Sequence, residues 1–494
     1  MKNFRAKQMC DISFALALII KLFGAGFRYF LTLDDYIQYG CYPLYENLHK
    51  VYFEIGTAAN RPLSAFLDPW LWGAFFSNMA FALLLMGIIF FLSAKLFDNV
   101  LKETGINITP FFYAVYIFLP LNFEGTYWIS ASSRVVVGLF FASLCTYLLI
   151  KYIKSGKKYI LVPYVICCLA SFGFYESITA FSGLLQGFVI LKFAIEEKRY
   201  KRLWLLVVPL FSALAVLAYY KFAGGIYAEN RVSEFNLDNF GDRLKSLITQ
   251  FGYIFTAGLY RTTFVGFIDG IKTIYGQGAW GILIALLILA VSFLCSFFGK
   301  REKISSPKAW VCVLSGILLT TLPLLPHILV PDVWLTYRAV VVSVFGLCVM
   351  LAPLLAIIFK NERIRCAAIF VVMTVFLTGC INELYTYKAV NELDLKILNE
   401  ITDKLDDEAL SKKKDVLLVF EKEVYTPQTS FYKDHVKSVF YTDWSSTGAV
   451  RAKAKNLNIK SVTPVYSLDG VDTEGKQIIY IDQFFNVTEG NYER

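Results

Sequence analysis

Long apolar segments with almost no charged residues recur along most of this chain, and they constrain its fold more than any other feature of the sequence. A helix needs about 20 apolar residues to cross a hydrocarbon core roughly 30 Å thick. Eleven segments approach this length, although the third and the fifth are short, and they predict an all-α polytopic membrane protein. The expected spans are residues 12–33, 70–95, 108–123, 134–152, 158–174, 177–195, 203–222, 278–299, 309–330, 338–360 and 366–386.

The composition supports this class over the alternatives. The chain is 56% hydrophobic and 18% charged, whereas an average soluble domain is about 45–50% apolar and about 25% charged. This difference, sustained over 494 residues, excludes a disordered chain, a collagen-like fibre and an ordinary cytosolic enzyme. The ten cysteines and three histidines show neither a CxxC pair nor a zinc-type spacing, so they predict no metal site.

Lysine and arginine predict the orientation, because they are enriched in the short loops that stay in the cytoplasm. With the N-terminus inside, all six inner segments carry basic residues, whereas the opposite short loops contain little more than Arg134 and Arg338. The opening residues resemble a signal peptide but lack a small-residue cleavage site, so residues 12–33 are expected to stay as the first span. We therefore expect a multi-pass protein of the cytoplasmic (cell) membrane with an odd number of spans and the C-terminus outside. The net charge of +9 then lies against the inner leaflet, which argues against nucleic acid as a partner.

The sequence predicts a multispan domain, residues 1–387, and a small α/β domain on the outer face, residues 388–494. Two outer loops of the first domain, residues 34–69 and 223–277, are too long to be plain turns. In the second loop, NLDNFGDRLKSLITQFGYIF has one apolar and one polar face, which favours a helix in the membrane interface. Residues 391–414 predict an amphipathic, charge-rich helix. Short strands are expected at residues 415–420, 438–443, 459–466 and 476–482.

Ionisable residues at the predicted outer ends of the spans are the main functional clue, because burying such groups at a membrane is costly. In the predicted topology all of them face one compartment. They are Asp34, Asp35, Arg61, Glu124, Arg134, Glu176, His327, Asp332 and Arg338.

The carboxylates have structural as well as functional interpretations. A single acidic residue just outside a span is usually a solvated helix end. Adjacent carboxylates such as Asp34 and Asp35 repel each other unless a cation, hydrogen bonds or protonation intervenes, so function and scaffold are both open for this pair. Glu176 indicates either a membrane-buried site or a break between two short helices at the outer surface.

The cations and aromatic residues also leave two interpretations. Arg134, at the head of a span, either binds an anionic ligand or extends to the phosphate headgroups of the lipid. For Arg338, helix anchoring and anion binding are comparable explanations. Tyr127 and Trp128 are most simply aromatic residues of the membrane interface.

The motifs LDDY, NRPL, SFGFYES and YWISASSR together resemble the GT-C membrane glycosyltransferases. The resemblance comprises an acidic pair in the first outer loop, an arginine-proline sequence before the second span, and a soluble C-terminal portion on the outer side. Within GT-C, the chain is similar to the group that includes the phage-type O-antigen glucosyltransferases. The likeness covers about the first 190 residues and the general layout.

This resemblance implies a hexosyltransferase of cell-envelope polysaccharide biosynthesis, which transfers a sugar from a polyprenyl-phosphate-linked donor to a surface glycan. It implies that Asp34 or Asp35 is the base that activates the attacking hydroxyl. The donor phosphate is assigned to the guanidinium groups of Arg134, Arg338 and Arg61. Contacts with the sugar or acceptor are assigned to Glu124, Trp128, Glu176 and Tyr127. As an alternative role, the acidic pair would bind a divalent metal ion through its hard oxygen ligands.

Other classes of function remain open at this point. The chain has no WWDYG-like motif and no cluster of outer-loop histidines, so the acceptor is undetermined. A transporter or flippase for a lipid-linked glycan is one alternative, although internal repeats and midplane charges, which transporters usually show, are not evident. A glycan polymerase without GT-C chemistry and a non-catalytic surface or assembly protein are the others.

Overall fold

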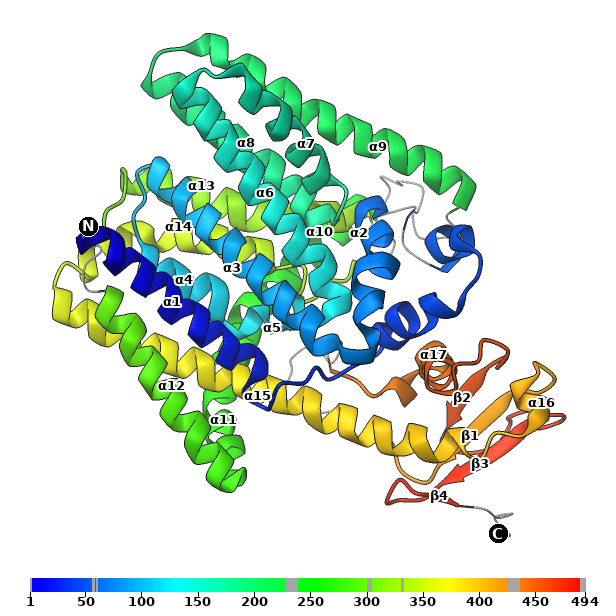
Figure 1. Cartoon of the computed structure of the whole chain (residues 1–494). Coiled ribbons are helices and arrows are strands. Elements are labelled where there is room, and N and C mark those ends of the chain that lie inside the picture. Colours follow the sequence, from blue (N-terminus) through cyan, green and yellow to red (C-terminus); the bar gives the residue numbers. More distant parts are fainter. Residues whose placement is uncertain are drawn as a thin grey trace. The chain divides into compact units, whose positions relative to one another are not determined.

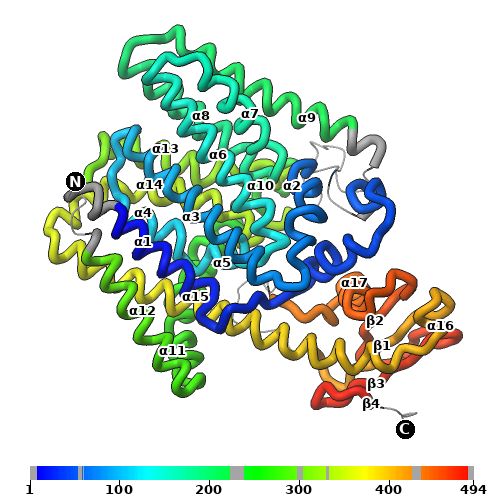
Figure 2. The backbone as a smooth tube through the Cα atoms, in the orientation of Figure 1, coloured from blue at the N-terminus to red at the C-terminus, as the bar shows by residue number. Residues whose placement is uncertain are grey.

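The computed structural model describes residues 2–55, 58, 61–227, 239–299, 304–329, 333–424 and 436–488. The chain forms two compact units, which we call the helical unit and the sheet unit. The helical unit comprises Met1–Gly26, Thr57–Ser64 and Leu83–Glu383, and the sheet unit comprises Phe27–Gly56, Ala65–Ala82 and Leu384–Arg494. Figure 1 labels the elements of both units, and Figure 2 traces the backbone.

Long apolar helices build the helical unit, because a helix satisfies its backbone hydrogen bonds internally and so tolerates an apolar surrounding. Several helices expose large apolar side chains, such as Leu210, Leu214 and Leu217, of which Leu214 is 64% exposed. Such faces suit contact with lipid. Two of the helices are shared with the sheet unit: α3 begins in it and α15 ends in it. The helices are α1 (Lys2–Phe23), α3 (Met79–Glu103), α4 (Thr109–Phe118), α6 (Ile129–Ser155), α7 (Leu161–Phe172), α8 (Glu176–Glu196), α9 (Val207–Tyr227), α12 (Gly278–Gly299), α13 (Ala309–Thr321), α14 (Val341–Ile358) and α15 (Glu362–Thr402).

Eight helices in the described part of the chain are long and apolar enough to cross a membrane. The prediction of a polytopic helical protein is therefore supported, but the count of eleven spans is not confirmed. The two short segments, 108–123 and 158–174, contain the helices α4 and α7, which have only 10 and 12 residues. The expected first span, residues 12–33, extends too far toward the C-terminus, because α1 ends at Phe23. Gly26, three residues later, has a φ of +106°, which a helix does not accommodate.

Short helices connect the long ones within the helical unit. The helix α2 (Pro62–Leu67) begins in the helical unit, and α5 (Phe123–Tyr127) comes directly before α6. The expected amphipathic helix of the loop 223–277 is present as α10 (Phe240–Tyr253), which is followed by α11 (Gly266–Gly276). The helices α6, α7 and α8 pack against one another, as the tube in Figure 2 shows.

The sheet unit contains a four-stranded sheet in the order β2-β1-β3-β4. The central strand β1 runs parallel to both β2 and β3, and β4 is antiparallel to β3. The helix α17 (Asp443–Ala454) contributes Ala449 and Val450 to the core, where they join Ile397 and Ile401 of α15. The strands are β1 (Val416–Phe420), β2 (Val462–Val465), β3 (Gln477–Ile481) and β4 (Val487–Thr488).

Three of the four expected strands are present, but the strand predicted at residues 438–443 is wrong. Val439–Tyr441 form a single 3-10 turn, in which the Ser438 hydroxyl accepts a hydrogen bond from the N–H of Phe440. Asp394 of α15 accepts hydrogen bonds from the Ser438 hydroxyl and the N–H of Val439. This contact across more than 40 residues overrides the local β-propensity of the segment.

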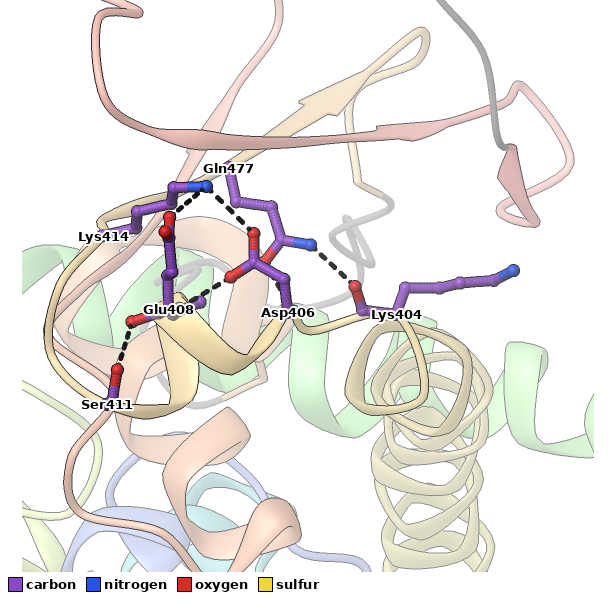
Figure 3. A network of polar contacts seen from close by, with 7 residues as sticks. Lys404, Asp406, Glu408, Ser411, Lys414 and Gln477 are labelled. Atoms are coloured by element: carbon purple, nitrogen blue, oxygen red, sulfur yellow. Dashed lines mark hydrogen bonds and ion pairs between the residues drawn. The ribbon is translucent and has the colours of Figure 1, made fainter.

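A polar network orders the chain between α15 and the sheet (Figure 3). Asp406 caps the short helix α16 (Asp407–Leu410) by accepting a hydrogen bond from the N–H of Ala409 at 2.7 Å. Lys414 forms an ion pair with the same carboxylate at 3.2 Å. Gln477 of β3 accepts from the N–H of Asp406 and donates to the carbonyl of Lys404. The charge-rich segment therefore forms two helices joined to the sheet, and not one continuous helix.

Candidate functional site

Arg61 and Glu176 form a bidentate ion pair in the helical unit. Glu176 is the first residue of α8, and the residues between α7 and α8 make a turn. The N–H of Leu63 donates to the carbonyl of Gly173 in this turn at 3.2 Å, which holds the start of α2 beside it. Arg61 Nε and Nη2 then reach the two oxygens of Glu176, each at 3.1 Å. The predicted break between two short helices at Glu176 is thus present, and the residue is also part of a charged site.

The exposure and surroundings of this pair suit a ligand site. The side chains of Arg61 and Glu176 are 23% and 30% exposed, so both are reachable from outside the protein. The guanidinium lies over the ring of Tyr175, with 4.5 Å between Cζ and the ring centroid. Glu176 is also the first residue of α8, where the helix dipole is positive.

Arg338 and Glu124 form the second ion pair, with 3.3 Å between Nη1 and Oε1. Glu124 lies on α5 and is fully buried, whereas the Arg338 side chain is 28% exposed. The guanidinium of Arg338 lies 5.2 Å from the ring of Trp128, the residue before α6. Gly125 permits this approach, since a Cβ there would lie 3.0 Å from Arg338 Cα and 2.6 Å from Val341 Cγ2.

His327 lies on a segment that packs beside the helix of the first ion pair. It belongs to the 3-10 segment Leu322–Leu329, which packs against α8, the helix that begins at Glu176. His327 Nε2 is buried and makes no hydrogen bond to any residue that the structure describes. We call Arg61, Glu124, Glu176, His327 and Arg338 the paired-arginine cluster.

The amphipathic helix α10 holds the chain on both sides of this cluster. Arg243 donates to the carbonyl of Ile328 at 3.4 Å, next to His327. Gln250 donates to the carbonyl of Val333 at 2.6 Å and accepts from the N–H of Leu335 at 2.7 Å, shortly before Arg338. Asp332, another residue singled out from the sequence, lies outside the described residues.

Three other predicted residues lie in the interior of the helical unit. Tyr127 is fully buried and stacks on Phe123 with 5.0 Å between the ring centroids, and Trp128 is only 3% exposed. Neither is therefore on a lipid-facing surface, where a membrane-interface aromatic residue would lie. Arg134, on the second turn of α6, is 7% exposed.

The acidic pair belongs to the sheet unit, and its two members differ. Asp35 is fully buried, and its Oδ2 accepts hydrogen bonds from the hydroxyl of Tyr29 at 2.6 Å and the N–H of Thr32 at 3.1 Å. The N–H of Asp35 in turn donates to the carbonyl of Thr32 at 3.0 Å, so Asp35 stabilises the local turn. Asp34 is partly exposed. Of the pair, Asp34 is therefore the one that a ligand could reach.

Lys21 was not identified from the sequence, although a lysine within an expected span is a signal for a functional or structural site. Its side chain is fully buried in the helical unit. Nζ donates to the carbonyl of Ile117 at 2.7 Å and to the hydroxyl of Thr126 at 3.0 Å, between the rings of Phe90 and Phe123. Lys21 thus fixes α1 to α5, the helix that carries Glu124.

The charges of the cluster define what it can do chemically. Two guanidinium groups are held in place by carboxylates, and the segment that packs against α8 carries a buried imidazole nitrogen. Such an arrangement binds an anion with fixed geometry and stabilises negative charge that develops on it. Among the described residues, no three His, Cys, Asp or Glu side chains gather in a way that could hold a metal ion. No protein family and no curated protein matches this chain in sequence.

Proposed function

We propose that this protein is a membrane glycosyltransferase that moves a hexose from a polyprenyl-phosphate-linked donor to a cell-surface glycan. The observation that supports the proposal most is the paired-arginine cluster, in which two guanidinium groups are each held by a carboxylate within a membrane-type helical unit. A phosphate group on a lipid carrier is an anion that must be bound where water is scarce. Guanidinium groups meet this need because they stay charged and match the geometry of phosphate oxygens.

The donor sugar leaves as its bond to the carrier phosphate breaks, so negative charge develops on the phosphate. Glu176 holds Nε and Nη2 of Arg61, and Nη1 makes no hydrogen bond to a described residue. Arg61 Nη1 is proposed to donate to the phosphate, while Arg338 and Arg134 contribute further positive charge. Glu124 and Glu176 then position the arginines, and Trp128 and Tyr127 shape the adjoining interior.

Asp34 is the proposed base. It would take the proton of the acceptor hydroxyl as this attacks the anomeric carbon. Attack from the face opposite the phosphate would invert the anomeric configuration. Asp35 is less suited to this role, because its Oδ2 is occupied by Tyr29 and Thr32. A divalent metal ion at the pair remains the alternative role for both carboxylates.

An apolar groove of about 690 Å³ in the helical unit supports a lipid substrate. Residues of α11 and α12, among them Ile271, Ile274 and Ile288, line it together with Thr374 and Thr378 of α15. Its walls offer few polar groups, as a prenyl chain requires. The proposal also includes the predicted topology of eleven spans, with the N-terminus inside and residues 388–494 outside.

The first test is sugar incorporation into the surface polymer of cells that carry Asp34→Asn or Asp35→Asn. We expect Asp34→Asn to lower incorporation by about 10²–10⁴-fold, because a general base contributes that much, while the protein still inserts into the membrane. Asp269→Asn on α11 removes a partly exposed surface carboxylate, paired with Lys272, and serves as the control. Normal incorporation in the Asp34→Asn cells would refute the base assignment.

A further inference from the structure

We propose that a basic pocket in the sheet unit binds a sugar that carries a phosphate or carboxylate group, and that this acidic glycan is the acceptor. The second part rests on the proposed function. The pocket has a volume of about 580 Å³ and forms where residues 44–50 meet the ends of α16 and α17. Its lining includes Tyr45, Lys50, Lys412, Arg451, Lys455 and Asn458.

The positive charges of this pocket outnumber its carboxylates among the residues that the structure describes. Four basic side chains line it, against one carboxylate, Glu46. None of the four forms an ion pair with a carboxylate in the described part of the chain. Elsewhere in the same unit lysines do form such pairs, as Lys414 does with Asp406 and Lys460 with Asp415. A concave site lined by one sign of charge concentrates ions of the opposite sign.

Backbone groups fix the position of some of these cations. Arg451 donates from Nε to the carbonyl of Ile459 at 2.8 Å and from Nη2 to that of Lys460 at 3.0 Å, so its guanidinium is fixed before any ligand binds. Lys412 and Lys455 have φ values of +68° and +51°. Glycine or asparagine normally occupies this left-handed region, because a Cβ crowds the backbone there. Lys455 is the C-cap of α17, so this backbone conformation places it at the end of the helix that borders the pocket.

The remaining lining groups indicate a sugar more than a bare anion. Tyr45 presents an aromatic ring, with Lys50 Nζ 5.7 Å from its centroid. Asn458 adds an amide that can both donate to and accept from hydroxyl groups. An aromatic ring, an amide and several cations are the groups that contact the ring face, the hydroxyls and the acidic group of a charged sugar. A phospholipid headgroup carries the same anionic chemistry, so the experiment includes it.

The test measures ligand binding to the purified full-length protein in detergent by ligand-detected NMR. The probes are glucose 6-phosphate, glucuronate and glucose, with vesicles of phosphatidylglycerol as the lipid arm. We expect the two acidic sugars to bind and glucose to bind at least tenfold more weakly, with the difference reduced by salt. Equal binding of glucose, no binding of either acidic sugar, or a preference for the vesicles would overturn the proposal.

Two pairs of variants locate the site. Lys412→Gln with Lys455→Gln should weaken glucose 6-phosphate binding at least tenfold. Lys422→Gln with Lys453→Gln changes the charge equally at exposed positions outside the pocket and should leave binding unchanged. If both double variants lose glucose 6-phosphate binding equally, binding depends on net charge alone and the pocket is not the site. Lys455→Gly separates binding from folding, because glycine suits its positive φ: the melting temperature should not fall although binding weakens.

The design also separates this proposal from the proposed function. Binding is measured without a lipid-linked donor, so it does not depend on sugar transfer. If acidic sugars bind and no transfer of sugar is found, the pocket stands and the glycosyltransferase proposal fails. If transfer occurs and acidic sugars do not bind, the pocket proposal fails alone.

Discussion

At the scale of single residues, the most consequential group is the fully buried carboxylate of Glu124. A buried charge is tolerated when a partner compensates it, and loss of that partner alone costs about 3–5 kcal/mol. Because the Arg338 side chain is 28% exposed, we expect Arg338→Met to lower the stability of the helical unit by no more than this amount. The double variant Arg338→Met with Glu124→Gln should recover most of the loss. Thermal unfolding in detergent measures both, and an unchanged melting temperature in the single variant would show that Glu124 is not held as an ion.

Gly125 provides a second test at the same scale. Gly125→Ala would place Cβ 2.6 Å from Val341 Cγ2 and 3.0 Å from the backbone of Arg338, so α5 or the Arg338 segment must move. We expect a loss of about 1–3 kcal/mol, as for other overpacked interiors. Gly187 of α8 has no atom within 4 Å of an added Cβ, so Gly187→Ala is the matched control and should be neutral or stabilising. Equal melting temperatures for the two variants would contradict the close approach at Gly125.

At the scale of elements, β1 and β2 are joined by a carboxylate whose ionisation can be tested. The pKa of Asp415 is lowered below its usual value by hydrogen bonds, first from Lys460 at 2.8 Å and then from Ser461 at 2.6 Å. A lowered folded-state pKa gives stability that is present above the unfolded pKa of about 3.9 and is lost as pH falls through the folded value.

Hydrogen exchange in β1 and β2, corrected for the intrinsic rate at each pH, should therefore accelerate below about pH 4. Asp415→Asn should remove this part of the pH dependence. At pH 7 the amides of β1 and β2 should exchange faster in this variant than in the wild type. Asp443→Asn, which alters a carboxylate at the start of α17 outside this pair, is the control. Identical pH profiles for the wild type and Asp415→Asn would rule out the contribution of this carboxylate.

Elements whose local pattern and packing agree were predictable from the sequence. The apolar runs that became α6, α8 and α14, and the short apolar segments between polar stretches that became β1 and β3, are examples. The segment 438–443 has a strand-like composition, but Asp394 and the Ser438 cap decide its structure from outside the local pattern. The end of α1 was not predictable from its apolar pattern alone. The next residue, Gly24, packs so closely on α15 that an added Cβ would lie 2.3 Å from Ile381 Cδ1.

At the scale of the whole molecule, the sequence identified all five members of the paired-arginine cluster but not how they pair. Charged residues beside apolar runs are conspicuous in any membrane-type chain, which is why Arg61, Glu124, Glu176 and Arg338 could be singled out. Their pairing could not be predicted, because 115 residues separate Arg61 from Glu176 and 214 separate Glu124 from Arg338. Tertiary packing alone brings such residues together. The same holds for Lys21, whose hydrogen-bond partners lie about a hundred residues away.

The most direct measurement is sugar transfer by the purified protein, reconstituted with radiolabelled polyprenyl-phosphate hexoses, in the wild type and in Arg61→Lys. Lysine keeps the positive charge, but its single ammonium group lacks the planar set of N–H donors with which arginine can bind Glu176 and a phosphate oxygen at the same time. We expect transfer to fall by about 10²–10³-fold in Arg61→Lys, which is the typical cost of losing one donor to a developing oxyanion. Arg199→Lys, at an exposed surface pair with Glu197, should transfer sugar as the wild type does. Full transfer by Arg61→Lys, or no transfer of any hexose by the wild type, would contradict the role proposed for the paired-arginine cluster.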